Sequence, residues 1–187
     1  MQIVKQSLYL LFFCCLITSC TTIITNNNSN ENDEYEKVRN LINEVYKTPY
    51  PYRNSKLKNE VFSENLLSLI SEARVVEKKS SERIPESERR NIKPIFLIES
   101  EIFASLYEGY VSHSIKKITL DKNKYLIDIE FINDLHATKE VWIDKLIIIK
   151  KNGLKLDNVI YNKEKTGVKD LKSFLASFNE EFYKSIK

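Results

Sequence analysis

The residues whose types and spacing best suit chemistry are carboxylates on two neighbouring predicted strands. In residues 125–131, apolar side chains alternate with Asp128 and Glu130, which is the pattern of a half-buried antiparallel strand. Residues 141–149 are predicted as the next strand, with odd-numbered apolar side chains facing inward. If the apolar faces of the two strands coincide, the opposite face gathers the remaining side chains. These are Asp128, Glu130, Glu140, Trp142 and Asp144.

Such an acidic face would suit a basic partner surface or a cation, with Trp142 as the apolar anchor that binding hot spots often use. The alternative is the solvated face of a sheet, with Trp142 packed under a loop. Carboxylates that cleave a glycosidic bond need one member with a raised pKa in an apolar pocket, and a wet face does not provide that pocket. We therefore predict no catalysis at these five residues, which form either a solvated face or a candidate partner-binding patch.

Other chemistry-bearing residues are few and lie apart. The two histidines, His113 and His136, stand in different segments without the spacing of metal ligands. Asp134 could orient the imidazole of His136, but no serine is marked as the nucleophile that a triad needs. The three glycines are isolated, so a glycine-rich phosphate loop is excluded. The sequence predicts no enzyme, no metal site and no cofactor.

The charge pattern excludes a nucleic-acid-binding surface of the usual kind. The chain has 29 Lys and Arg against 26 Asp and Glu. Basic residues alternate with acidic ones, as in residues 77–79, whereas a phosphate-binding stripe needs clustered, unopposed basic side chains. We predict a solvated surface of mixed charge.

Cys20 is the one cysteine that lies in a recognisable sequence motif. It ends the sequence Leu-Ile-Thr-Ser-Cys, behind an uncharged run over residues 8–17 and a single preceding basic residue, Lys5. A run of about ten residues is too short to span a bilayer and fits the central region of a secretory signal peptide. This lipobox resembles the signal of bacterial lipoproteins. The resemblance implies cleavage between Ser19 and Cys20, a diacylglyceryl thioether on Cys20, and an amine acylated by a fatty acid such as palmitate.

Removal of the signal would leave a domain without a free thiol, because Cys14 and Cys15 lie inside it. We predict a signal peptide at residues 1–19, a flexible Asn-rich tether at residues 20–32, and one domain at residues 33–187. The membrane partner would be reached through the lipid on Cys20. Thr21 stands where an Asp favours retention in the inner membrane, so we expect outer-membrane anchoring that faces the periplasm.

Apolar spacing predicts an α+β domain with helices first and strands after them. A first helix should begin at Asp33 and end before Pro49 and Pro51. A second should begin at Ser63. The charged residues 77–91 are either the solvated end of this helix or a surface excursion, of which we predict the excursion, and a short helix should follow Ser100. Four strands are expected at residues 112–120, 125–131, 141–149 and 154–161, with a bulge near residues 157–158, and a closing helix at residues 171–182.

The hairpin at residues 151–161 resembles the closing hairpin of cystatin-like and NTF2-like domains in small bacterial lipoproteins. Its Asn152-Gly153 turn fits that pattern, whereas Leu154 replaces the usual Trp and Asn158 replaces the second Asp. Residues 38–46 and 98–109 are similar to a lipoprotein family of this superfamily that is a domain of unknown function. The resemblance implies a curved antiparallel sheet packed against helices and carries over no catalytic residue.

From these features we expect a membrane-anchored periplasmic binding or accessory lipoprotein without catalytic activity, for example an immunity or inhibitor protein with a protein partner in the envelope. One alternative is an NTF2-like pocket protein or enzyme, with a small molecule in the concavity of the sheet. Another is a structural envelope lipoprotein. No residue pattern names the partner or the oligomeric state.

Overall fold

A computed structural model describes residues 28–48, 50–88, 102–105, 109–134 and 138–185 of the chain. The chain divides into two compact units, Met1–Glu36 and Lys37–Lys187. The described part of the first unit is the beginning of a helix. The second unit contains the sheet and the remaining helices.

The order of the elements confirms the predicted α+β class. The helices are α2 (Asn28–Lys47), the short 3-10 helix η1 (Pro51–Arg53), α3 (Ser55–Val61), α4 (Glu64–Arg83), the 3-10 helix η2 (Glu86–Glu88) and α5 (Leu171–Ser185). The strands are β1 (Ser112–Asp121), β2 (Lys124–Asn133), β3 (Glu140–Ile149) and β4 (Lys155–Ile160). Within the described residues, no helix combines the length and the apolar character that crossing a membrane requires.

The first helix begins earlier than predicted, at Asn28 rather than at Asp33. Asp33 therefore lies inside the helix and does not cap it, and the last residues of the predicted tether are helical. Glu31 in the first turn suits the positive end of the helix dipole. The end of α2 at Lys47, ahead of the prolines, confirms the predicted stop.

The helix α4 begins where the sequence predicts, because the Ser63 hydroxyl accepts a hydrogen bond from the Leu66 amide at 3.2 Å. It runs on to Arg83, so the prediction of a surface excursion from Glu77 is wrong over its first part. Val76 and Ser80 are buried and continue the inner stripe of the helix at four-residue spacing. The short helix expected after Ser100 is replaced over residues 102–105 by a turn.

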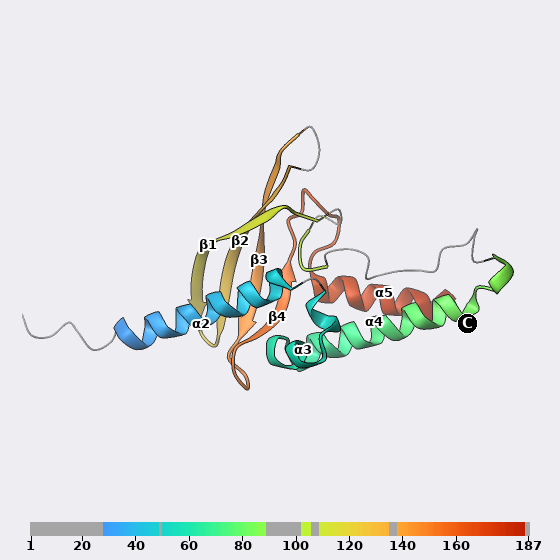
Figure 1. Cartoon of the computed structure of the whole chain (residues 1–187), viewed down its shortest axis with the longest axis horizontal. Coiled ribbons are helices and arrows are strands. Elements are labelled where there is room, and N and C mark those ends of the chain that lie inside the picture. Colours follow the sequence, from blue (N-terminus) through green and yellow to red (C-terminus); the bar gives the residue numbers. More distant parts are fainter. Residues whose placement is uncertain (1–27, 49, 89–101, 106–108, 135–137, 186–187) are drawn as a thin grey trace, which may run out of the picture. The chain divides into compact units, whose positions relative to one another are not determined.

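The sheet has the order β1-β2-β3-β4, and every neighbouring pair is antiparallel (Figure 1). The predicted bulge in β4 is confirmed: Ile147 pairs with Asn158 and Ile148 with Leu156, so Asp157 is the extra residue. The predicted positive φ angles at Asn152 and Gly153 are confirmed, at 56° and 92°. The connection is longer than the predicted tight turn, because the strands pair only as far as Ile149 and Lys155.

The pairing of β2 with β3 differs from the prediction. Phe131 pairs with Trp142 and Ile129 with Asp144, so the odd-numbered residues of β2 share a face with the even-numbered residues of β3. The expectation that Val141 and Ile143 face inward is therefore wrong. Because β3 is apolar on both faces near its end, alternation alone does not specify its register. The observed pairing buries the large indole of Trp142.

The core lies between one face of the sheet, here called the inner face, and the helices. Ile127, Ile129 and Phe131 of this face are fully buried. The end of α2 packs on it, with the rings of Tyr46 and Phe131 5.4 Å apart. The helices α4 and α5 pack against each other and against β4 (Figure 1). The predicted inner stripe of α5 is confirmed at its buried members, Leu171, Leu175 and Phe182.

Candidate functional site

The opposite face of the sheet, here called the outer face, carries apolar side chains that no described helix covers. Val141 and Ile143 on β3 have exposed fractions of 48% and 47%. Val141 pairs with the half-buried Ile132 of β2, and Leu126 pairs with Ile147 towards the other end of the strands. The face therefore presents two apolar groups, one at each end of the β2–β3 pair.

Ion pairs lie between the two apolar groups of the outer face. The Lys145 ammonium contacts the Asp128 carboxylate at 3.2 Å, and the Lys116 ammonium contacts the Glu130 carboxylate at 3.2 Å. Partly exposed pairs of this kind contribute about 0–1 kcal/mol to stability. Each pair neutralises one acidic and one basic side chain, so the middle of the outer face has balanced charge and apolar side chains lie at both ends of it. This composition suits protein docking.

The five residues predicted to form one acidic face lie on two faces. Asp128 and Glu130 are on the outer face, whereas Glu140, Trp142 and Asp144 are on the inner side of β3. The predicted common acidic face is thus wrong, and its cause is the register of β3. Glu140 is half-buried and bound by the Lys165 ammonium at 2.6 Å.

Asp144 is the centre of a buried hydrogen-bonded cluster, with an exposed fraction of 1%. Its carboxylate accepts hydrogen bonds from the backbone N–H of Ser105 at 2.8 Å and from the Trp142 indole at 3.3 Å. It also accepts from the Ser105 hydroxyl and from the backbone N–H of Asn162, the latter at 2.9 Å. Burial raises the pKa of the Asp144 carboxyl, and these hydrogen bonds oppose the shift.

The Asp144 cluster joins three separate parts of the chain, and its geometry is that of a structural tie. Every described contact of the carboxylate is to a hydrogen-bond donor of the fold itself. Ser105 and Asn162 were not anticipated from the sequence, because they lie outside the strands and no local pattern marks them as partners of β3. The sequence offered only an aspartate two residues from a tryptophan on a predicted strand, and nothing in it marked that aspartate as buried.

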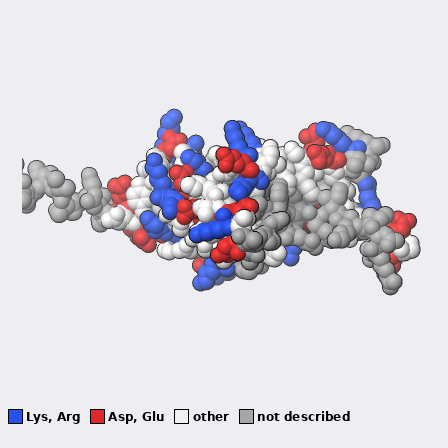
Figure 2. Space-filling view, turned by 90° about the horizontal axis from the view of Figure 1, so that it is seen from above, with Lys and Arg blue, Asp and Glu red and all other residues white. Residues whose placement is uncertain are grey.

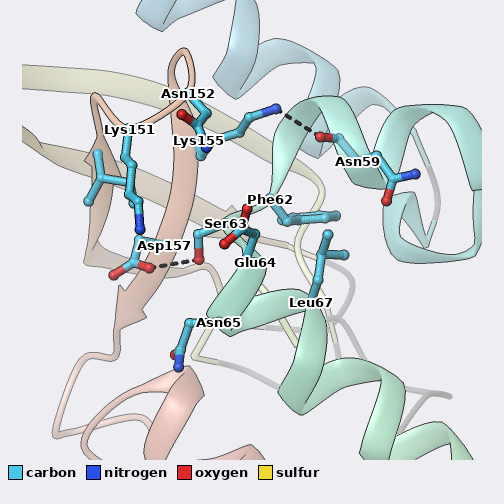
Figure 3. A pocket seen from close by; sticks show the side chains of 11 residues that line it. Asn59, Phe62, Ser63, Glu64, Asn65, Leu67, Lys151, Asn152, Lys155 and Asp157 are labelled. Atoms are coloured by element: carbon cyan, nitrogen blue, oxygen red, sulfur yellow. Dashed lines mark hydrogen bonds between the residues drawn. The ribbon is translucent and has the colours of Figure 1, made fainter.

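A groove of about 410 Å³ lies beside the start of α4, where β4 and the β3–β4 loop meet α3 (Figure 3). Asp157 accepts a hydrogen bond from the Ser63 hydroxyl at 2.7 Å and contacts the Lys172 ammonium at 2.7 Å. The Lys155 ammonium donates to the backbone carbonyls of Asn59 and Glu60 at 2.8 and 2.7 Å. These polar groups hold α3, α4 and β4 together, so the groove is a junction within the fold.

The described histidine, His113, sits among aromatic rings at one end of β1. Its ring centroid lies 5.0 Å from that of Tyr46 and 5.9 Å from that of Tyr110. Burial lowers the pKa of the His113 imidazole. His136 lies outside the described residues. Over the part of the chain that the structure describes, no three His, Cys, Asp or Glu side chains are grouped as they would be around a metal ion.

Comparison of the chain with protein-family models, curated proteins and solved structures gives no match. The surface itself is mixed in charge. On the face shown in Figure 2, acidic and basic side chains lie beside one another. On the outer face of the sheet, Val141 and Ile143 add two exposed apolar side chains that lie close together on one strand.

Proposed function

We propose that this protein is a lipoprotein of the bacterial envelope that binds a protein partner through the outer face of its sheet and has no catalytic activity. The observation that carries the proposal is the exposure of Val141 and Ile143 on that face. Exposed apolar groups that lie together and are rimmed by polar residues are typical of interaction sites.

The use of the polar groups supports a binding role over a catalytic one. The carboxylates of Asp144 and Asp157 are engaged by several donors of the fold, and both hold loops or helix ends in place. A general acid or base needs a titratable group within reach of a substrate. The buried position of Asp144 and the bonding of Asp157 favour structural roles.

The packing of the inner face argues against the pocket alternative. A small-molecule pocket in the concavity of the sheet would need open space between the sheet and the helices. Ile127, Ile129 and Phe131 instead fill this side and have no exposed surface. The inner face, which the helices cover, therefore belongs to the core, and partner binding is proposed for the outer face.

The proposed setting follows from the lipobox at Cys20. A lipid on that residue would hold the domain at a membrane, and Thr21 favours the outer membrane and the periplasm. An immunity or inhibitor protein is the version of this function that we favour, because such proteins act by occupying another protein's surface and need no reactive site of their own.

Photo-crosslinking in the native cells tests the proposal. A photoreactive amino acid is placed separately at Val141, at Ile143 and, as a matched control, at Val75, a valine of α4 with a similar exposed fraction of 47%. We expect the same crosslinked partner from both positions on β3 and none from Val75, and loss of the Val141 crosslink when Ile143 is changed to Lys. Equal crosslinking from all three positions, or none from β3, would contradict the proposal.

A further inference from the structure

The two edges of the sheet differ in how they are covered. The free side of β4 is closed by its own chain: Leu156 bridges to Phe62, and Ile160 bridges to Asp170. The backbone N–H of Ser63 also donates to the Leu156 carbonyl at 2.9 Å. In contrast, β1 is ten residues long and pairs only with β2 among the described residues.

None of the ten residues of β1 is buried, as expected for a strand at an open edge. Long open edges are sites where another strand can add to a sheet. The bulge between Ile115 and Lys117 interrupts the edge and increases its local twist. An added strand therefore has to match a twisted edge, which restricts unspecific pairing.

Charges on the outer face alternate across three strands and end at this edge. Lys145 on β3 pairs with Asp128 on β2, and Asp128 pairs in register with Lys117 on β1. The Asp128 carboxylate contacts Lys145 at 3.2 Å, and Lys117 has no ion pair among the described residues. The neighbouring Lys116 is 48% exposed at its side chain although it contacts Glu130. The row of alternating charges thus stops on a basic residue.

We infer that the open edge of β1 accepts an extended segment of a protein partner, with an acidic residue beside Lys117. This inference rests on the proposed partner-binding function and names the chemistry of the partner. An acidic side chain in a fifth strand would continue the alternation of Lys145, Asp128 and Lys117, and opposite charges stabilise neighbouring strands. A second copy fits less well, because symmetric pairing of two β1 strands about their middle would place lysines beside lysines.

Peptide binding to the full lipoprotein in detergent tests the inference. The probe is a blocked ten-residue peptide of alternating threonine and valine with glutamates at two central positions. The control peptides carry lysines at those positions, or N-methylated backbone amides. Affinity is measured by titration, and the site by amide hydrogen exchange of the protein.

We expect the glutamate peptide to slow exchange within residues 112–121 and to bind roughly fivefold more tightly than the lysine peptide. Lys117→Glu should reverse that preference, whereas Lys122→Glu, the same change in the adjoining turn, should leave it unchanged. The N-methylated peptide should not bind. Equal affinity of the two charged peptides, protection outside β1, or self-association of the protein through β1 would overturn the inference.

The outcomes separate this inference from the proposed function. Partner crosslinking from Val141 without peptide binding at β1 would refute the open-edge inference and leave the outer-face function standing. Peptide binding at β1 with no crosslinking from Val141 or Ile143 would refute the outer-face function.

Discussion

Replacement of Asp144 is the sharpest test of the interior of the domain. One oxygen of the carboxylate accepts hydrogen bonds from the Ser105 backbone N–H and from the Trp142 indole N–H. Asp144→Ala leaves both buried N–H donors without this acceptor, and the Ser105 hydroxyl, which donates to the other oxygen, also loses it. Each unsatisfied buried donor costs about 1–3 kcal/mol, so we expect a loss of about 4 kcal/mol in the free energy of unfolding. The backbone N–H of Asn162 keeps one acceptor, because it also donates to the Ser105 hydroxyl oxygen at 2.7 Å.

Asp144→Asn should cost far less, about 1 kcal/mol. Its amide oxygen can keep the two donors from Ser105 and Trp142, and its amide N–H₂ can donate to the Ser105 hydroxyl oxygen. The cost arises at the other oxygen, where the Ser105 hydroxyl loses its acceptor and the backbone N–H of Asn162 keeps only the Ser105 hydroxyl oxygen. The matched control is Asp128→Asn on the outer face of β2, which removes one partly exposed ion pair and should cost about 0–1 kcal/mol.

The assay is denaturant unfolding followed by tryptophan fluorescence. Trp142 is the single tryptophan of the chain and is 3% exposed, so its emission reports directly on the cluster. A cost below about 1 kcal/mol for Asp144→Ala, or equal costs for the Ala and Asn variants, would refute the assignment of Asp144 as the acceptor for buried donors.

The pH dependence of the same variants provides a second readout. Burial raises the pKa of Asp144 in the folded protein above its ordinary value of 3.8. Its contribution to stability is therefore fully present below pH 3.8 and is lost as the pH rises through the folded pKa. We expect the difference in stability between the wild type and Asp144→Asn to shrink over that rise, and a growing difference would contradict the direction of the shift.

Three further predictions follow from the register, the aromatic cluster and the end of α3. Trp142→Ala should cost about 3–5 kcal/mol in denaturant unfolding followed by circular dichroism, while Ile143→Ala should cost less than about 1 kcal/mol, and the reverse order would mean that the register is wrong. Burial lowers the pKa of the His113 imidazole, so the stability that His113 contributes should be present above its unfolded pKa and be lost as the pH falls through the folded pKa. A nuclear magnetic resonance titration that places the pKa of His113 at or above 6.5 would contradict this. Lys155→Met removes the ammonium that caps the α3 carbonyls and should cost about 0.5–1 kcal/mol, with faster amide exchange in α3 and unchanged exchange in α5.

Features decided by local chemistry were predictable from the sequence. The cap at Ser63 follows from its hydroxyl ahead of an apolar stripe. The bulge at Asp157 follows from the change of phase between Leu156 and Val159. The turn at Asn152 follows from residues that accept positive φ angles. In each case a few neighbouring residues contain the whole cause.

Features decided by distant contacts were not predictable. Both faces of β3 are apolar near its end, so the sequence favours neither register, and the choice depends on where Trp142 and Asp144 find partners. Ser105, which lies 39 residues away from Asp144 in the chain, supplies two of those contacts. The candidate docking face was missed for the same reason, because the outward position of Val141 and Ile143 is a consequence of the register.

Mass spectrometry of the native protein extracted from cell membranes tests the central claim most directly, namely that this domain acts while anchored to a membrane. We predict an N-terminal peptide that begins at Cys20 and carries a diacylglyceryl group and an acylated amine. A mature protein that begins at Met1 with an unmodified Cys20 would contradict the claim.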